Sequence, residues 1–288
     1  MSCVRSGRPL RCSLRSPLHW PFSPQLAGKR DVLSGSFIHI PGVGPITERR
    51  IWQRGLHSWA DFLRDPAAAG LSARATDRVV EAVAASLSRL QEEDCAYFAA
   101  ALPRPQHWRA YPEFAHRVAF LDIETTGLQQ DDDVTLIGVY DGRTVRTYVK
   151  GEDLHQFADD IGEYRLIVTF FGAAFDLPVL RRRFPGVQFH QLHVDLCHAL
   201  RRLGLGGGLK HIEAKLGIAR SPETKGLDGW DAVRLWREWE AGSRHALELL
   251  KRYNAEDVVN LETLMRYAYR ELRSRSGFPP AYPESGGR

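Results

Sequence analysis

The 288-residue sequence has few cysteines and no long apolar segment. Its four cysteines, Cys3, Cys12, Cys95 and Cys197, show neither the spacing of a metal or redox motif nor the density of a disulfide framework. No stretch approaches the about 20 consecutive apolar residues that a membrane-spanning helix needs. We therefore expect a protein of a reducing, cytoplasmic compartment with no membrane partner.

Acidic residues are absent from residues 1–30, which hold six basic residues. Of the 39 basic residues in the chain, 33 then remain against 35 acidic residues, so the rest of the chain has a formal net charge of −2. A nucleic-acid partner would have to be held by local basic patches and bound metal, because the chain has no global positive field.

Both ends of the chain are rich in Arg, Ser and Pro, which predicts a disordered basic tail over 1–35 and a flexible tail over 272–288. An Arg- and Ser-rich, acid-free N-terminus is also typical of an organelle transit peptide. Prolines at positions 9, 17, 21 and 24 would interrupt the amphipathic helix of such a peptide. We therefore favour a flexible arm, or a start site placed upstream of the true one.

Residues 36–103 predict a small all-helical region. The segment from Ile40 to Gly44, Ile-Pro-Gly-Val-Gly, resembles a helix-hairpin-helix motif. Gly42 and Gly44 would permit the tight turn, and amides at the start of the second helix would bind a phosphate. A plain αα-hairpin explains the same residues equally well. One long helix is expected over 72–99, with Ser72 as its N-cap.

Residues 104–271 predict an α/β domain, in which three strands joined by short turns precede crossover helices. This order gives a mixed sheet with helices on its faces. The expected strands are 117–123, 134–140, 144–149 and 165–170, and the expected helices are 153–162, 174–183, 196–203, 209–216, 229–240 and 243–271.

Two acids interrupt the first of these strands. Asp122 and Glu124 stand at i and i+2, so they project side by side from one face of a buried element. Burying two like charges is costly unless a cation neutralises them, and carboxylate oxygens suit magnesium or manganese. A bare Asp-x-Glu pair is also common as a solvated or salt-bridged pair, so the two residues alone leave both interpretations open.

The longer string from Phe120 to Leu128, Phe-Leu-Asp-Ile-Glu-Thr-Thr-Gly-Leu, resembles the first motif of the DEDD 3′–5′ exonucleases, which share the ribonuclease H-like fold. The resemblance implies a carboxylate after the fourth strand, where Asp176 opens a helix. It also implies Tyr-x-x-x-Asp on the last helix, where Tyr253 and Asp257 stand. This motif is typical of the tyrosine (DEDDy) subclass, whose tyrosine orients the attacking water. In isolation, Asp176 is an ordinary first-turn helix residue, and Tyr253 and Asp257 are a pair capping a core helix.

Three later segments strengthen the resemblance: His-x-Asp-Leu at 193–196, Gly-Gly-Leu-Lys at 207–210 and Arg-Tyr-Asn-x-Glu-Asp-Val at 252–258. In this order they are similar to the YprB-like branch of the ribonuclease H-like superfamily, over residues 104–270. The implied fold is a mixed five-stranded sheet flanked by helices. Family members often carry Asn where Phe171 stands. This difference bears on the efficiency of catalysis and does not affect the four acids.

Other residues near these motifs have two interpretations each. Lys210 and Thr125 are candidate contacts to nucleic acid, as are Arg181 and Arg182 on the helix that begins at Asp176. The arginines fit a solvated helix face equally well. His193 and His198 could be metal ligands, although we favour a structural role for at least one of them.

The hypothesis from the sequence is a two-metal nuclease that acts as a 3′–5′ exonuclease on DNA or RNA. Asp122, Glu124, Asp176 and Asp257 would hold two Mg²⁺ or Mn²⁺ ions about 4 Å apart, and Tyr253 would position the water. The alternative is a catalytically weak or inactive ribonuclease H-like module that binds nucleic acid. A scaffold that binds proteins through the helical region is a third possibility, and no protein partner is indicated.

Overall fold

A computed structural model describes residues 32–127 and 133–279 of the chain. The predicted tail over 1–31 and residues 280–288 of the predicted C-terminal tail lie outside the described residues. Val32 and Leu33 fall within the segment predicted as tail, yet both are buried in the hydrophobic core. At the other end, the last helix continues to Arg275, beyond the predicted boundary at 271.

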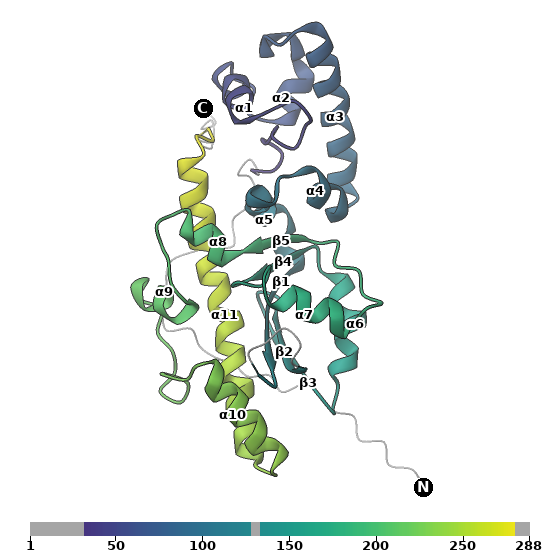
Figure 1. Ribbon diagram of the computed structural model, residues 1–288. Coiled ribbons are helices and arrows are strands. Elements are labelled where there is room, and N and C mark those ends of the chain that lie inside the picture. Colours follow the sequence, from purple (N-terminus) through teal and green to yellow (C-terminus); the bar gives the residue numbers. More distant parts are fainter. Residues whose placement is uncertain (1–31, 128–132, 280–288) are drawn as a thin grey trace, which may run out of the picture.

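A mixed five-stranded sheet forms the centre of the fold, in the order β3-β2-β1-β4-β5 (Figure 1). The pairs β1–β2 and β2–β3 are antiparallel, whereas β1–β4 and β4–β5 are parallel. This arrangement confirms the predicted α/β class. The strands are β1 (Val118–Thr125), β2 (Val134–Tyr140), β3 (Val145–Val149), β4 (Leu166–Thr169) and β5 (Leu192–Asp195). Only β5 lacks a predicted counterpart among the expected strands, because its sequence Leu-His-Val-Asp is short and half polar, unlike the apolar run of β4.

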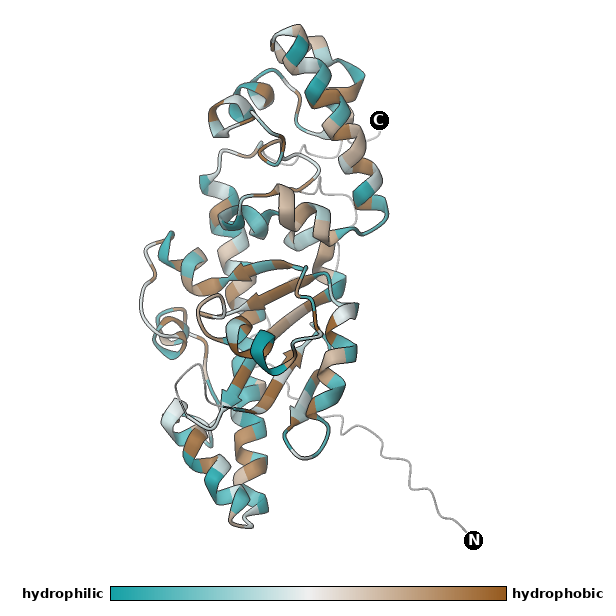
Figure 2. Ribbon diagram, turned by 45° about the vertical axis from the view of Figure 1, so that its right-hand side comes forward, coloured by the Kyte–Doolittle hydropathy of each residue, from teal (hydrophilic) through white to brown (hydrophobic). Residues whose placement is uncertain are grey.

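Alternation along β1 assigns the two faces of the sheet. Leu121 and Ile123 pack with the short helix α6 (Phe157–Asp160) and with α7 (Asp176–Arg183). Phe120 packs on the other side, in a core that includes the long helix α11 (Arg244–Arg275). The central strands β1, β2 and β4 are accordingly largely hydrophobic (Figure 2). Asp122 and Glu124 share the parity of Phe120, so they face α11.

The helices before the sheet differ in one respect from the prediction. The single helix expected over 72–99 is wrong, since α3 (Ala73–Gln91) ends and α4 (Cys95–Ala101) starts anew. Glu93 has a left-handed backbone (φ 53°), which no helix continues through. The Asp94 side chain then caps α4 by accepting from the Tyr97 amide at 3.0 Å.

The helix-hairpin-helix prediction meets only half of its expected geometry. Gly42 has φ +86° and makes a tight turn, and α1 (Pro45–Gln53) begins directly after Gly44. Within the described segment 32–44, however, the chain before α1 forms successive turns instead of a helix. The buried carboxylate of Glu48 holds these turns, since it accepts from the amides of Phe37 (2.7 Å) and Ile38 (3.1 Å).

The remaining elements connect these layers, and one core spans residues of both the N-terminal helices and the sheet. They are α2 (Trp59–Arg64), η1 (Pro66–Ala69), η2 (Arg104–Ala110), α5 (Tyr111–Phe114), η3 (Ala115–Arg117), η4 (Leu154–Gln156), η5 (Ile161–Glu163), α8 (Leu196–Arg201), α9 (Leu209–Lys215) and α10 (Gly229–Glu240). Over the described ranges, none of the helices has the length and apolarity to traverse a lipid bilayer.

Candidate active site

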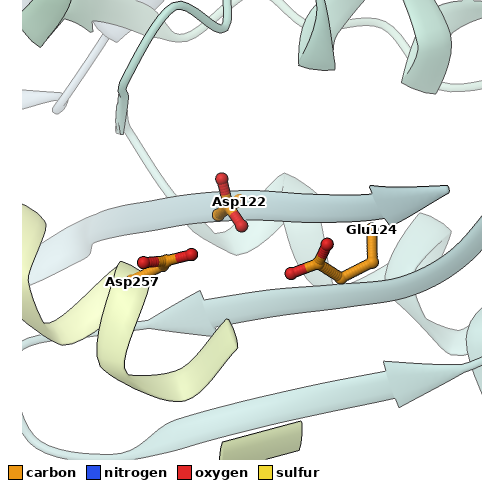
Figure 3. Close-up of side chains that lie close together, drawn as sticks. All are labelled: Asp122, Glu124 and Asp257. Atoms are coloured by element: carbon orange, nitrogen blue, oxygen red, sulfur yellow. The ribbon is translucent and has the colours of Figure 1, made fainter. Parts of the chain in front are cut away.

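Three carboxylates converge between β1 and α11. Asp122 and Glu124 project from β1, and Asp257 reaches toward them from α11 (Figure 3). Each contributes an oxygen that lies within 4.8 Å of those of the other two. The period of two along β1 thus places Asp122 and Glu124 on one face of the sheet. The apolar face of α11, which packs against the sheet, supplies the third acid.

Asp176 is the fourth predicted acid and stands apart from that cluster of three. It is 4% exposed at the start of α7, and it lines the same cavity of about 200 Å³ as Asp122, Glu124 and Asp257. Its charge is among the causes that raise the pKa of Asp122. All four acids predicted from the sequence therefore border one cavity.

Burial and mutual repulsion disfavour ionisation at this site. Burial, followed by the charge of Asp257, raises the pKa of Glu124 to about 8. The pKa of Asp176 is raised by burial to about 7. Burial is also the main cause of the raised pKa values of Asp122 and Asp257, and the charges of Asp257 and Glu124 add to the effect at Asp122. The nearby positive charges of Arg220 and Lys210 therefore compensate the cluster only in part.

Asn254 is a site residue that the sequence analysis missed. Its side-chain amide donates to Oδ2 of Asp122 at 2.9 Å and to Oε1 of Glu124 at 3.4 Å. It packs against Gly138 of β2, the residue paired with Asp122 in the sheet, where a Cβ would collide with the Asn254 side chain. The sequence signals were its place three residues before Asp257 and within the segment 252–258 that carries the family resemblance.

Arg220 is a second missed residue, and it provides the positive charge nearest to Asp257. Its Nη2 donates to Asp257 Oδ1, and its Nε donates to Oε2 of Glu213 at 2.7 Å. All three side chains are at most 6% exposed. The Nη1 group of Arg220 is buried without a hydrogen-bond partner among the described residues.

Tyr253 and Lys210 lie together at the edge of the cluster. Lys210 Nζ donates to the Tyr253 hydroxyl and lies 4.3 Å from the centre of its ring. Burial, followed by the charges of Asp257, Glu124 and Asp122, raises the pKa of Tyr253, so its phenol stays protonated at neutral pH. The tyrosine is therefore available as a neutral hydrogen-bonding group beside the acids.

Phe171 lines the acidic cavity and has a strained backbone. Its φ is +67°, a region that asparagine enters more readily than phenylalanine, and 49% of its surface is exposed. Asp195 holds the loop in this shape by accepting from the amides of Phe171 (2.9 Å) and Ala173 (3.0 Å). The Asn typical of this position in the resembling family thus suits the backbone conformation.

The predicted nucleic-acid contacts lie in three parts of the structure. Thr125 lines the acidic cavity, and Lys210 lies beside it through Tyr253. Arg181 and Arg182 are exposed near the far end of α7, about 9 Å along the helix from Asp176. Gly42 and Gly44 belong to the N-terminal turns and do not line this cavity.

The two histidines considered as metal ligands, His193 and His198, lie outside the acidic cluster. His193 bonds through Nε2 to the hydroxyl of Thr169 at 2.9 Å, and its backbone amide donates to His107 Nδ1 at 3.1 Å. His198 is exposed on α8, with Nε2 4.0 Å from Asp195. Neither belongs to the cluster of three carboxylates.

The residues present fit a divalent cation of the magnesium or manganese type. The candidate ligands are all carboxylate oxygens, the donors such ions prefer. Their raised pKa values report an uncompensated negative charge, and Asn254 Oδ1 is buried with no hydrogen-bond partner in the described part of the chain. A cation held here would relieve the repulsion that burial creates.

Comparison with known proteins identifies the family of the chain. A family model described as the RNase_H superfamily matches residues 119–269. The solved structure of the family B DNA polymerase from the hyperthermophilic archaeon Pyrobaculum calidifontis is similar at 19% identity, with a TM-score of 0.46. That similarity covers 56% of this chain and 25% of the polymerase, so the chain spans about a quarter of its length. No curated protein matches the chain.

Proposed function

The chain belongs to the RNase_H superfamily, and on this premise we propose that it is a metal-dependent nuclease, a 3′–5′ exonuclease of the DEDDy, YprB-like type that hydrolyses DNA or RNA. The observation that carries the proposal is the convergence of Asp122, Glu124 and Asp257 within 4.8 Å, with Asp176 on the same cavity. Membership of the superfamily supports nuclease activity in general. The direction of attack rests on the resemblance of the motifs.

The four acids have a common role in this proposal. Asp122, Glu124, Asp176 and Asp257 would hold two Mg²⁺ or Mn²⁺ ions, which when bound supply Lewis-acid activation of water and stabilisation of the leaving oxygen. Asn254 fixes the carboxylates of Asp122 and Glu124 by donating to both. These side chains are held by one strand and two helices, β1, α7 and α11, elements that keep a constellation of groups rigid.

Tyr253 would orient the attacking water. Because Lys210 donates to the phenol oxygen, the O–H of Tyr253 remains free to donate toward the cavity that it lines. Its raised pKa excludes a phenolate base at neutral pH, so its action is orientation and not proton abstraction. Lys210 and Thr125 would contact the phosphate backbone at the same cavity.

The test uses the full chain on single- and double-stranded DNA and RNA, each labelled at the 5′ or the 3′ end. With Mg²⁺ or Mn²⁺, 5′-labelled strands should shorten progressively, and 3′-labelled strands should release labelled mononucleotide at once. Asp122→Asn should lower the rate by roughly 10²-fold or more, because the cation contributes several kcal/mol. Asp159→Asn, on an exposed residue of α6, is the matched control.

Equal cleavage by wild type and Asp122→Asn, or none by either, would overturn the enzyme assignment. The second candidate function, a non-catalytic nucleic-acid-binding module, is favoured by the pairing of Arg220 with Asp257, which occupies one acid of the set. Binding of an oligonucleotide without cleavage in either metal would select it.

A further inference from the structure

A second cavity lies away from the candidate active site, where α1, η2 and the C-terminal end of α11 meet. Its volume is about 290 Å³, and it is lined by four arginines against a single acid, Glu48. From Asp257 to Leu272, a lining residue, the distance along the axis of α11 is about 22 Å. In Figure 1, α1 lies beside this end of α11. The nuclease proposal makes no use of this cavity.

Internal pairing accounts for only one of the four arginines. Arg109, which is 3% exposed, donates from Nη1 to Glu48 Oε1 at 2.9 Å and from Nε to Gln106 Oε1 at 2.9 Å. Glu48 also accepts the amides of the N-terminal turns, so its charge is fully engaged. The acid in the lining is therefore already neutralised.

The other three arginines, Arg49, Arg202 and Arg275, are exposed around the cavity. Within the described residues, their guanidinium groups donate to backbone carbonyls alone, those of Pro45, Pro105 and Leu203. Among residues 32–127 and 133–279, no carboxylate lies within ion-pair distance of any of them. Three positive charges are therefore held together without a counter-anion.

Two further observations indicate an anionic ligand. Burial and the charge of Arg109 lower the pKa of Arg202, which means that the site disfavours its own positive charge. The indole N–H of Trp108, another lining residue, is buried with no hydrogen-bond partner in the described part of the chain. An anion would relieve the repulsion and add an acceptor to a site with surplus donors.

We propose that this arginine cavity binds a phosphate of the nucleic-acid strand, as a substrate-holding site separate from the acidic cavity. Guanidinium groups match phosphate oxygens with two parallel hydrogen bonds, which suits arginine to this ligand. The chain after residue 30 has a formal net charge of −2, so a nuclease of this kind needs a local basic patch to retain nucleic acid, which is a polyanion. The 22 Å along α11 corresponds to about six or seven base-pair steps at 3.4 Å each, a length that a short duplex spans.

The inference rests on the proposed function only in taking nucleic acid as the ligand, so the test measures binding without turnover. A fluorescent 20-mer duplex is titrated with the full-length protein in EDTA at several salt concentrations. Arg202→Gln/Arg275→Gln should bind about tenfold more weakly. The slope of log affinity against log salt should be smaller by roughly 1–2, since one or two phosphate contacts are lost. Arg74→Gln/Arg143→Gln, two exposed arginines outside the cavity, should match wild type.

Inorganic phosphate forms the second arm of the experiment. If it raises the melting temperature of wild type but not of Arg202→Gln/Arg275→Gln, while the two bind the duplex equally, the cavity takes free phosphate and the nucleic-acid assignment is overturned. Equal duplex binding with no effect of phosphate overturns the site altogether. Arg49→Gln, which loses only a local contact to Pro45, serves as a second variant if the double variant melts early. If the protein binds the duplex through the arginines but does not cleave it, the nuclease proposal is contradicted and the arginine cavity is not.

Discussion

Arg220 pairs with Asp257, one of the acids proposed to hold metal. The guanidinium donates to Asp257 Oδ1 and, through Nε, to Glu213 at 2.7 Å, with all three groups out of solvent. Breaking a buried pair from one side leaves an uncompensated charge. The arginine thus acts as a built-in counter-ion for a cluster that otherwise has too little positive charge.

We expect Arg220→Gln to lower the free energy of unfolding by about 3–5 kcal/mol in EDTA, because Asp257 and Glu213 lose their partner. Mn²⁺ should restore more stability in this variant than in wild type, since the metal ion supplies the missing charge. Urea denaturation with and without Mn²⁺ measures both effects. Arg234→Gln breaks an exposed ion pair and should cost less than about 1 kcal/mol. Equal losses in the two variants would contradict the buried-pair assignment.

The backbone conformation of Phe171 leads to a second prediction, which concerns stability. At φ +67°, a phenylalanine is strained, whereas asparagine tolerates the left-handed region. Phe171→Asn should therefore stabilise the protein by about 1 kcal/mol, measured as a higher midpoint of urea denaturation. Phe171→Ala removes the same ring but retains a Cβ and gains no such tolerance, so it should not stabilise. Equal effects of the two substitutions would show that the exposed ring, not the backbone, determines stability here.

Local periodicity predicted two of the acids but none of their partners. Asp122 and Glu124 follow from the period of two on a strand, whereas Asp176 and Asp257 were expected from the motif resemblance. Arg220 lies in the irregular segment between α9 and α10, and its pairing with a residue 37 positions away has no local signal. The left-handed turns at Glu93 and Phe171 were equally hidden, because neither residue type favours that conformation.

The buried His39 should make stability depend on pH between 5 and 7. Burial, followed by the charge of Arg109, lowers its pKa to about 4. Below pH 6.5 the unfolded chain binds a proton that the folded protein does not, so stability is fully present above pH 6.5 and falls as pH decreases toward 4. From pH 7 to 5 the loss should be about 2 kcal/mol.

His39→Gln should remove that part of the pH dependence, because glutamine does not titrate in this range. The measurement is urea denaturation of wild type and variant at pH 7 and 5, and the difference between the two proteins isolates His39 from the other buried histidines. An unchanged pH dependence in the variant would show that His39 is already protonated in the folded state near pH 5.

Metal binding at the acidic cavity should release protons. The pKa of Glu124 is raised to about 8 by burial and the charge of Asp257, and burial raises that of Asp176 to about 7. Both groups are protonated in the folded protein at a pH where the unfolded chain has lost these protons. These two carboxyl groups therefore contribute a stability to the metal-free protein that is lost as pH rises from about 4 to 8, opposite in sign to the contribution of His39. A divalent cation has to displace the same protons, since it binds carboxylates in their ionised form.

The affinity for Mn²⁺ should therefore rise between pH 6 and 8, by about tenfold per pH unit for each proton displaced. Titration calorimetry in buffers of different ionisation enthalpy counts these protons directly, without any substrate. Glu124→Gln should release fewer protons than wild type at pH 7, whereas Asp159→Asn on α6 should release the same number. Mn²⁺ affinity that does not change over this range would mean that the carboxylates are ionised before metal binds. In that case Arg220, Lys210 and Asn254 would compensate their charge more fully than their contacts indicate.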